Sequence, residues 1–206
     1  HRLLARGRIV ADPEGAGHRM SSTDGAQTRG MSKVSTAFLL TCAAIGVASG
    51  IVLAAAWWIS STLFVAVPLV SIGIAGIWLM PAVIALRLIQ RPFAGLLVGL
   101  ISGLVLAPFF TIGAVATTMF WSFFPELPFL VTLYKRWSTW MHYAGATIVG
   151  IAYPILAAVS FGLWTIPLWM QISYFALNLV SCLVGTWLGI VVADRLRRAG
   201  VARLAR

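Results

Sequence analysis

The sequence predicts an all-α integral membrane protein with six transmembrane helices, because apolar residues dominate it and its few charges are clustered. Of its 206 residues, 60% are hydrophobic and 10% are charged, and the mean hydropathy is +0.95. Soluble domains carry about 25% charged residues. A helix needs roughly 20 apolar residues to cross a bilayer core. Six such stretches are expected, at 37–58, 71–89, 93–110, 117–134, 142–164 and 168–193.

The segment between the first two spans, 59–70, is apolar but contains Pro68. A helix interior tolerates proline poorly. We therefore expect an extracellular loop that dips back towards the membrane.

The positive charges predict the orientation of these spans. The 15 Lys and Arg residues lie before the first span, between the second and third, between the fourth and fifth, or after the sixth. The connections on the other side carry no charge. The positive-inside bias then places both termini in the cytoplasm, in a multi-pass plasma-membrane protein. The net charge of +10 also favours contact with anionic membrane lipids. The basic residues of 195–206 therefore need no nucleic-acid partner to explain them.

Composition divides the chain into three parts. Residues 1–33 are polar and are expected to be disordered. Met20 and Met31 are each plausible natural starts, so this segment is left out of the functional argument. Residues 34–194 form the transmembrane domain, and 195–206 form a basic cytoplasmic tail.

Glu126 is the only acidic residue between Lys33 and Asp194. A carboxylate deep in a bilayer costs several kcal/mol unless it faces a cavity, a partner or a ligand. Two interpretations stay open: Glu126 meets a polar or cationic solute, or it is protonated and hydrogen-bonded to a neighbouring helix. Pro125 and Pro128 flank it and are expected to kink or open the helix, which favours a binding site.

The last span carries a polar stripe of Gln171, Tyr174, Asn178 and Ser181, spaced three, four and three residues apart. Such spacing places all four on one helix face. They indicate either the wall of an outward-facing cup or hydrogen bonds that join helices.

Small residues recur at four-residue intervals in two other spans. The first span has Ala44 and Ala48, with Gly46 and Gly50, and the third has Gly95, Gly99 and Gly103. This spacing lets helix backbones approach closely, either inside the bundle or against another subunit.

The sequence offers no sign of an enzyme. It has no G-x-x-x-x-G-K-[ST] motif for gripping ATP, and no catalytic or metal-ligand spacing. His142 is expected to be a hydrated loop residue, and Cys42 and Cys182 to fill the core. We therefore expect no catalytic residue, no metal and no cofactor.

Two segments carry a family resemblance. The run Gly76-Ile77-Trp78, followed by the turn Arg91-Pro92-Phe93-Ala94-Gly95, resembles the helix-two to helix-three signature of YkoE-type S components. These are the substrate-binding subunits of energy-coupling factor (ECF) vitamin transporters. Glu126 with the basic turn 133–137, and the final helix from Asn178 to Asp194, are similar to the same family. The third helix departs from the family pattern, since Gly99 and Leu106 stand about where the family carries acidic residues.

The resemblance implies a subunit that captures thiamine or a related pyrimidine at the extracellular side. It also implies two partners: a transmembrane coupling (T) subunit and a pair of ABC-type ATPases. The alternatives are a membrane scaffold without transport activity and an autonomous secondary carrier. The substrate-binding residues expected are Glu126, Trp78, Ser122, Gln171, Tyr174 and Asn178. The partner interface expected is the small-residue face of Ala44, Ala48, Gly46 and Gly50.

Overall fold

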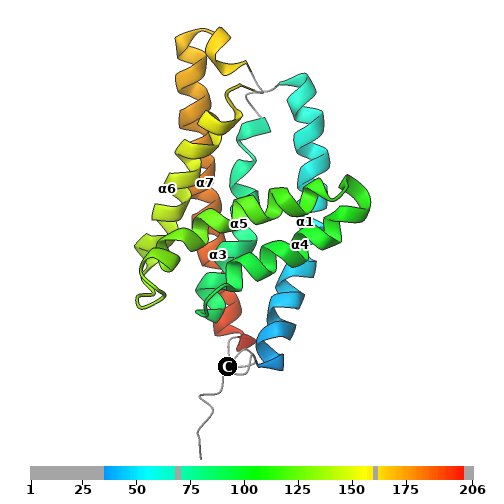
Figure 1. Cartoon of the computed structure of the whole chain (residues 1–206), viewed down its shortest axis with the longest axis vertical. Coiled ribbons are helices and arrows are strands. Elements are labelled where there is room, and N and C mark those ends of the chain that lie inside the picture. The colour runs from blue at the N-terminus through cyan, green and yellow to red at the C-terminus, as the bar shows by residue number, and fades with distance from the viewer. Residues whose placement is uncertain (1–34, 68–70, 160–161, 202–206) are drawn as a thin grey trace, which may run out of the picture. The chain divides into compact units, whose positions relative to one another are not determined.

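The computed structural model describes residues 35–67, 71–159 and 162–201, and every regular element within them is helical. This confirms the all-helical prediction. The predicted polar segment 1–33 and residues 202–206 of the basic tail lie outside the described residues. The elements in chain order (Figure 1) are α1 (Thr36–Ala66), η1 (Ala75–Leu79), α3 (Met80–Ile89), α4 (Ala94–Phe110), α5 (Gly113–Val131), α6 (Thr139–Ala157), η2 (Leu163–Thr165) and α7 (Leu168–Arg198).

Three of the described helices are long and apolar enough to cross a membrane, namely α1, α5 and α7. Figure 1 shows α4 and α5 as an antiparallel pair that is steeply inclined to α1, α6 and α7. Both α4 and α3 are shorter than a typical spanning helix. Six spans and cytoplasmic termini therefore remain predictions.

The expected loop at 59–70 is wrong for its first part, because α1 continues as a helix to Ala66. The hydroxyls of Ser61 and Thr62 donate to the carbonyls of Trp57 and Trp58 one turn earlier, at 2.8 and 2.9 Å. Such local bonds are compatible with a continuous helix. The helix ends at Ala66, because Val67 precedes proline and such a residue is driven out of the α conformation.

The predicted second span, 71–89, is not one continuous α-helix. Ser71 and Ile72 are α-helical, a turn follows, the 3-10 helix η1 begins at Ala75, and α3 begins at Met80. Ser181 of α7 explains the irregular start, because its hydroxyl donates to the Gly73 carbonyl (2.7 Å) and accepts from the Gly76 N–H (2.9 Å). These backbone groups are satisfied by a neighbouring helix rather than by their own.

Helix α5 does not open at Pro125 and Pro128 but stays α-helical from Gly113 to Val131. Pro128 has no N–H to give to the carbonyl of Phe124. Gly145 of α6 packs there, since a Cβ at that glycine would lie 2.6 Å from the Phe124 oxygen. The prolines thus make room for a close helix contact.

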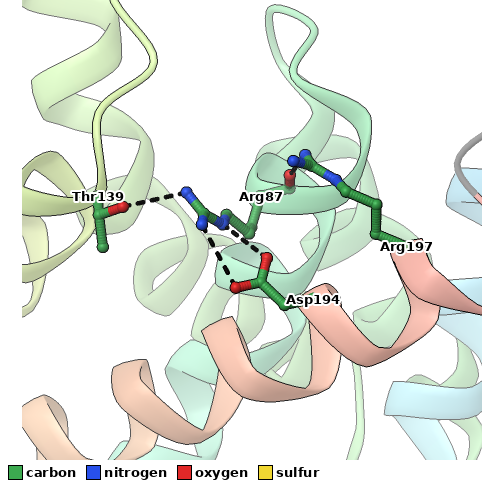
Figure 2. Close-up of polar contacts among 4 residues, drawn as sticks. All are labelled: Arg87, Thr139, Asp194 and Arg197. Atoms are coloured by element: carbon green, nitrogen blue, oxygen red, sulfur yellow. Dashed lines mark hydrogen bonds and ion pairs between the residues drawn. The ribbon is translucent and has the colours of Figure 1, made fainter.

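Polar side chains join α3, α6 and α7 at the end of the bundle that carries the basic residues, here called the basic end (Figure 2). The Arg87 guanidinium donates to both carboxylate oxygens of Asp194, at 3.0 and 3.3 Å, and to the Thr139 hydroxyl at 3.1 Å. Arg197 donates to the Arg87 carbonyl at 2.6 Å. The two-point contact fixes the orientation of the arginine as well as its position.

Two expectations about buried residues have different outcomes. Cys42 and Cys182 are fully buried free thiols, as predicted. The prediction of a hydrated loop for His142 is wrong, because its side chain is 2% exposed in α6 and lies against the Phe129 ring at 4.9 Å between centroids.

Glycines set the closest helix approaches. Gly46 and Gly50 of α1 pack against α4, where added Cβ atoms would lie 2.7 Å from Ile101 and 2.8 Å from Val105. Ser102 of α4 also donates to the Gly46 carbonyl at 3.0 Å. Of the two interpretations of these glycines, the structure favours packing inside the bundle.

We predict that Gly185→Ala destabilises the detergent-solubilised protein. A Cβ at Gly185 would overlap the carbonyl oxygen and carbon of Gly76 and lie 2.6 Å from its Cα, so η1 and α7 would have to separate. Overpacking of this kind costs about 1–3 kcal/mol. Gly113→Ala is the matched control, because the nearest atom to its Cβ is the Thr111 hydroxyl at 3.5 Å. Equal melting temperatures for the two variants would contradict the prediction.

Candidate functional site

A cavity of about 930 Å³ lies at the end of the bundle opposite the basic end. Its walls come from the C-terminal part of α1, residues 71–78, α5, α6, η2 and the first turns of α7. Sites for small organic ligands typically measure about 300–1,000 Å³ and are mainly apolar. The cavity is therefore large enough for a vitamin-sized molecule.

Aromatic rings form much of the wall. Trp57 and Trp78 meet edge to face, with ring centroids 5.5 Å apart. The ring centroids of Trp121 and Tyr153 are 4.8 Å apart. Tyr174 completes the set and is buried. Contacts between the rings hold them in place. The cavity, called the aromatic cavity below, thus presents a preformed aromatic surface.

The polar side-chain groups of the wall are hydroxyls and the indole N–H groups of the tryptophans. Ser60, Ser61, Ser71 and Thr117 line the cavity beside the two tyrosines. Ser61 donates to the Trp57 carbonyl at 2.8 Å, and Thr117 to the Gly113 carbonyl at 3.0 Å. Because their hydrogens are used within their own helices, these two oxygens are left as hydrogen-bond acceptors.

Helix geometry explains the α1 side of this wall. Trp57, Ser61 and Phe64 are spaced four and three residues apart and share one face of α1. This row was missed from the sequence because 59–70 was expected to be a loop. The i, i+4, i+7 spacing was the signal that indicated a continuing helix.

Two of the predicted site residues, Trp78 and Tyr174, line the aromatic cavity. The other four do not. Ser122 is buried against Gly99 of α4. Gln171 donates to the Ile166 carbonyl at 2.9 Å and faces a shallow groove beside α6.

Asn178 lies beneath the cavity rather than in its wall. Its amide donates to the Gly150 carbonyl of α6 at 2.8 Å, and its side chain is fully buried. Its Oδ1 has no hydrogen-bond partner among the described residues. The predicted stripe therefore divides: Tyr174 faces the cavity, whereas Asn178 and Ser181 join helices, which was the alternative interpretation.

Glu126 lies at the basic end, away from the aromatic cavity. Its carboxylate accepts the Leu96 N–H of α4 at 2.7 Å and the Tyr134 hydroxyl at 2.9 Å, and the residue is 1% exposed. The Leu96 N–H belongs to the first turn of α4, whose amides have no partner within the helix. A carboxylate there also meets the positive end of the helix dipole. The geometry favours hydrogen bonding between helices over contact with a solute.

Comparison with known proteins identifies the family. A family model described as "ABC-type cobalt transport system, permease component" matches residues 39–152, from α1 into α6. The chain belongs to this family.

A solved structure shares the fold of this permease-family chain. It is titled "Crystal structure of an S-component of ECF transporter", with a TM-score of 0.72 and 21% sequence identity. The match covers 82% of this chain and 88% of the other. At this identity the likeness shows the fold alone. A search of the curated proteins gave no match.

We predict that Glu126→Ala lowers stability without changing ligand affinity at the aromatic cavity. The substitution leaves the partly buried Leu96 N–H without its acceptor, which costs about 1 kcal/mol or more. Thermal unfolding and ligand titration of the same preparations measure both effects. Tyr134→Phe removes one donor only and serves as the milder comparison. A loss of ligand affinity with unchanged thermal stability would contradict the prediction and indicate that Glu126 contacts the solute.

Proposed function

We propose that the chain is the substrate-capture (S) component of an ECF-type importer in the plasma membrane, with no catalytic activity of its own. The observation that carries the proposal is the aromatic cavity at the uncharged end of a fold shared with an S-component. By the positive-inside bias, that end faces the exterior. The cavity would then receive its ligand from outside the cell.

The proposed substrate is thiamine or a related pyrimidine vitamin or precursor. The family resemblance suggests these compounds, and the walls suit a flat ring. Stacking against Trp57, Trp78 and Trp121 would supply most of the buried area, and the hydroxyls would orient the ring.

Cobalt, which the family description names, fits this cavity less well. Divalent transition metals in proteins are held by imidazole, thiolate or carboxylate ligands. The polar atoms of the wall come from Ser, Thr, Tyr and Trp. Across the described residues, no group of three or more His, Cys, Asp or Glu side chains is placed to hold a metal.

The proposed partners are a T subunit and a pair of ABC-type ATPases that supply the energy for transport. Membership of an ABC-type transport family supports this assignment. A scaffold without transport activity has no need of a preformed aromatic cavity, so the cavity favours capture over scaffolding. An autonomous carrier would bind ligand but transport it without the ATPases.

Substrate capture is tested by mass spectrometry of small molecules that co-purify with the protein, followed by titration of the identified ligand. We expect Trp78→Leu to weaken binding about tenfold or more, because one stacking face is lost. Trp187→Leu is the matched control, since Trp187 is 54% exposed on α7 and does not line the cavity. Equal affinities for the two variants, or no bound molecule at all, would contradict the proposal.

Of the four small residues predicted to contact the T subunit, we propose Ala44 and Ala48, because both are exposed on α1. Gly46 and Gly50 are buried against α4 and are not available to a partner. Replacing either alanine with Leu should block close helix approach. We expect co-purification of the T subunit to fall sharply while ligand affinity is unchanged. Ala176→Leu, at an exposed alanine of α7, should leave both unchanged. Undiminished co-purification in both α1 variants would place the interface elsewhere.

A further inference from the structure

Basic side chains at the basic end outnumber the carboxylates that could pair with them. The part of the chain that the structure describes holds only two acidic residues, Glu126 and Asp194. Asp194 is paired with Arg87. Glu126 is 1% exposed, and its oxygens accept hydrogen bonds from Leu96 and Tyr134. The remaining cations have no ion-pair partner among the described residues, and they are Arg91, Lys135, Arg136, Arg195, Arg197 and Arg198.

Three of these cations lie on two connections that meet each other. Arg91 belongs to the connection before α4, and Lys135 and Arg136 belong to the connection before α6. The ring centroids of Phe93 and Tyr134, one from each connection, are 5.7 Å apart. The two connections therefore present one continuous surface. We call it the basic seam and define it as Arg91, Phe93, Leu133, Lys135, Arg136 and Trp140.

Large apolar side chains are exposed beside the cations of the basic seam. Phe93 is 55% exposed, Leu133 is 69% exposed and Trp140 is 64% exposed. The last turn of α7 is also basic, but no large apolar side chain is exposed in residues 195–199. Cations interleaved with exposed aromatic and aliphatic side chains are typical of surfaces that lie at the headgroup level of a membrane.

Two of these apolar residues are also held in a strained backbone conformation. The φ angles of Phe93 and Leu133 are 60° and 51°, in the left-handed region that non-glycine residues rarely adopt. Such strain persists where surrounding contacts offset it. The exposed side chains of Phe93 and Leu133 make few contacts within the chain. This favours a stabilising contact that comes from outside the chain.

The position of the basic seam distinguishes between possible partners. Its residues flank the ends of the apolar helices α4, α5 and α6, where the chain leaves the bilayer. The positive-inside bias places this end in the cytoplasm, and the cytoplasmic leaflet carries anionic lipids. A free phosphate or a nucleic acid would neutralise the cations but leave the apolar side chains in water. An anionic phospholipid satisfies both parts of the surface.

We propose that the basic seam binds an anionic phospholipid of the cytoplasmic leaflet. Arg91, Lys135 and Arg136 contact the headgroup phosphate. Phe93, Leu133 and Trp140 enter the adjoining acyl region. The lipid joins the two connections from outside the bundle, whereas Glu126 joins them from within through Leu96 and Tyr134. This inference does not depend on substrate capture.

Native mass spectrometry of the full chain, titrated with dioleoyl-phosphatidylglycerol or dioleoyl-phosphatidylcholine, compares an anionic with a zwitterionic lipid. We expect phosphatidylglycerol to bind at least tenfold more tightly. Each cation near an anionic surface changes affinity about fivefold, so Lys135→Gln with Arg136→Gln should weaken phosphatidylglycerol binding by about tenfold or more. Lys135→Arg with Arg136→Lys keeps both charges and should keep the preference. Equal binding of the two lipids by the wild-type chain would overturn the inference.

A second double variant tests the location. Arg195→Gln with Arg198→Gln removes the same charge from the last turn of α7, where no large apolar side chain is exposed. We expect phosphatidylglycerol affinity to fall by less than about threefold. Equal losses in the two neutralised variants would indicate a diffuse attraction to the whole basic end and would overturn the assignment to the basic seam.

The apolar part of the basic seam has its own test. Asn adopts the left-handed conformation more readily than Leu, so Leu133→Asn should keep or raise the melting temperature in detergent. It should weaken binding of both lipids by a similar factor, because an apolar anchor does not distinguish headgroups. Unchanged binding of both lipids would contradict the proposed insertion of Leu133.

Competition identifies the source of the phosphate group. We expect neither inorganic phosphate nor a short DNA duplex to displace bound phosphatidylglycerol, because neither can cover the apolar side chains. Displacement by inorganic phosphate would indicate a site for soluble anions, and displacement by the duplex would indicate a nucleic-acid surface. Either result would overturn the inference.

Discussion

The carboxylate of Glu126 is the contact on which the arrangement of the basic end depends. It joins the first turn of α4 to α5 and to Tyr134, which begins the connection to α6. The chain enters α4 through Phe93 in a left-handed conformation, with a φ of 60° and no capping side chain of its own. An acceptor from another helix therefore supplies what the local sequence lacks. The position of α5 is fixed relative to the start of α4.

Two adjacent rows of side chains on α5 have different roles. Thr118, Ser122 and Glu126 follow one another at four-residue spacing and face α4, where Gly103, Gly99 and Gly95 make room for them. The next row, Thr117 and Trp121, faces the aromatic cavity. One helix thus packs the bundle with one face and lines the cavity with the neighbouring face. This arrangement separates the charge of Glu126 from the uncharged wall.

The sequence predicted the helical class and most helix boundaries because these depend on local properties. The break between α3 and α4 follows from proline and polar residues that are visible in the chain, whereas the first span was predicted to end at Trp58 and α1 runs to Ala66. The role of Glu126 was not predictable in this way. The scarcity of acidic residues singled out Glu126 in the sequence. Its partner could not be predicted, because it is the N–H of Leu96, 30 residues earlier. Likewise, the spacing of Tyr174 and Asn178 placed them on one face, yet only the crossing of α6 at Gly150 decides which of them meets the cavity.

Helix α1 is the element that connects the proposed capture site with the proposed partner face. Its C-terminal part contributes Trp57 and Ser61 to the cavity wall, and Ala44 and Ala48 are exposed nearer its N-terminus. The helix is continuous over 31 residues, about 46 Å at 1.5 Å per residue. Gly46 and Gly50 alternate with the two alanines and hold the opposite face of the same stretch against α4. The alanines therefore offer a partner the exposed face of a helix whose other face is fixed to α4 and whose C-terminal part belongs to the cavity wall.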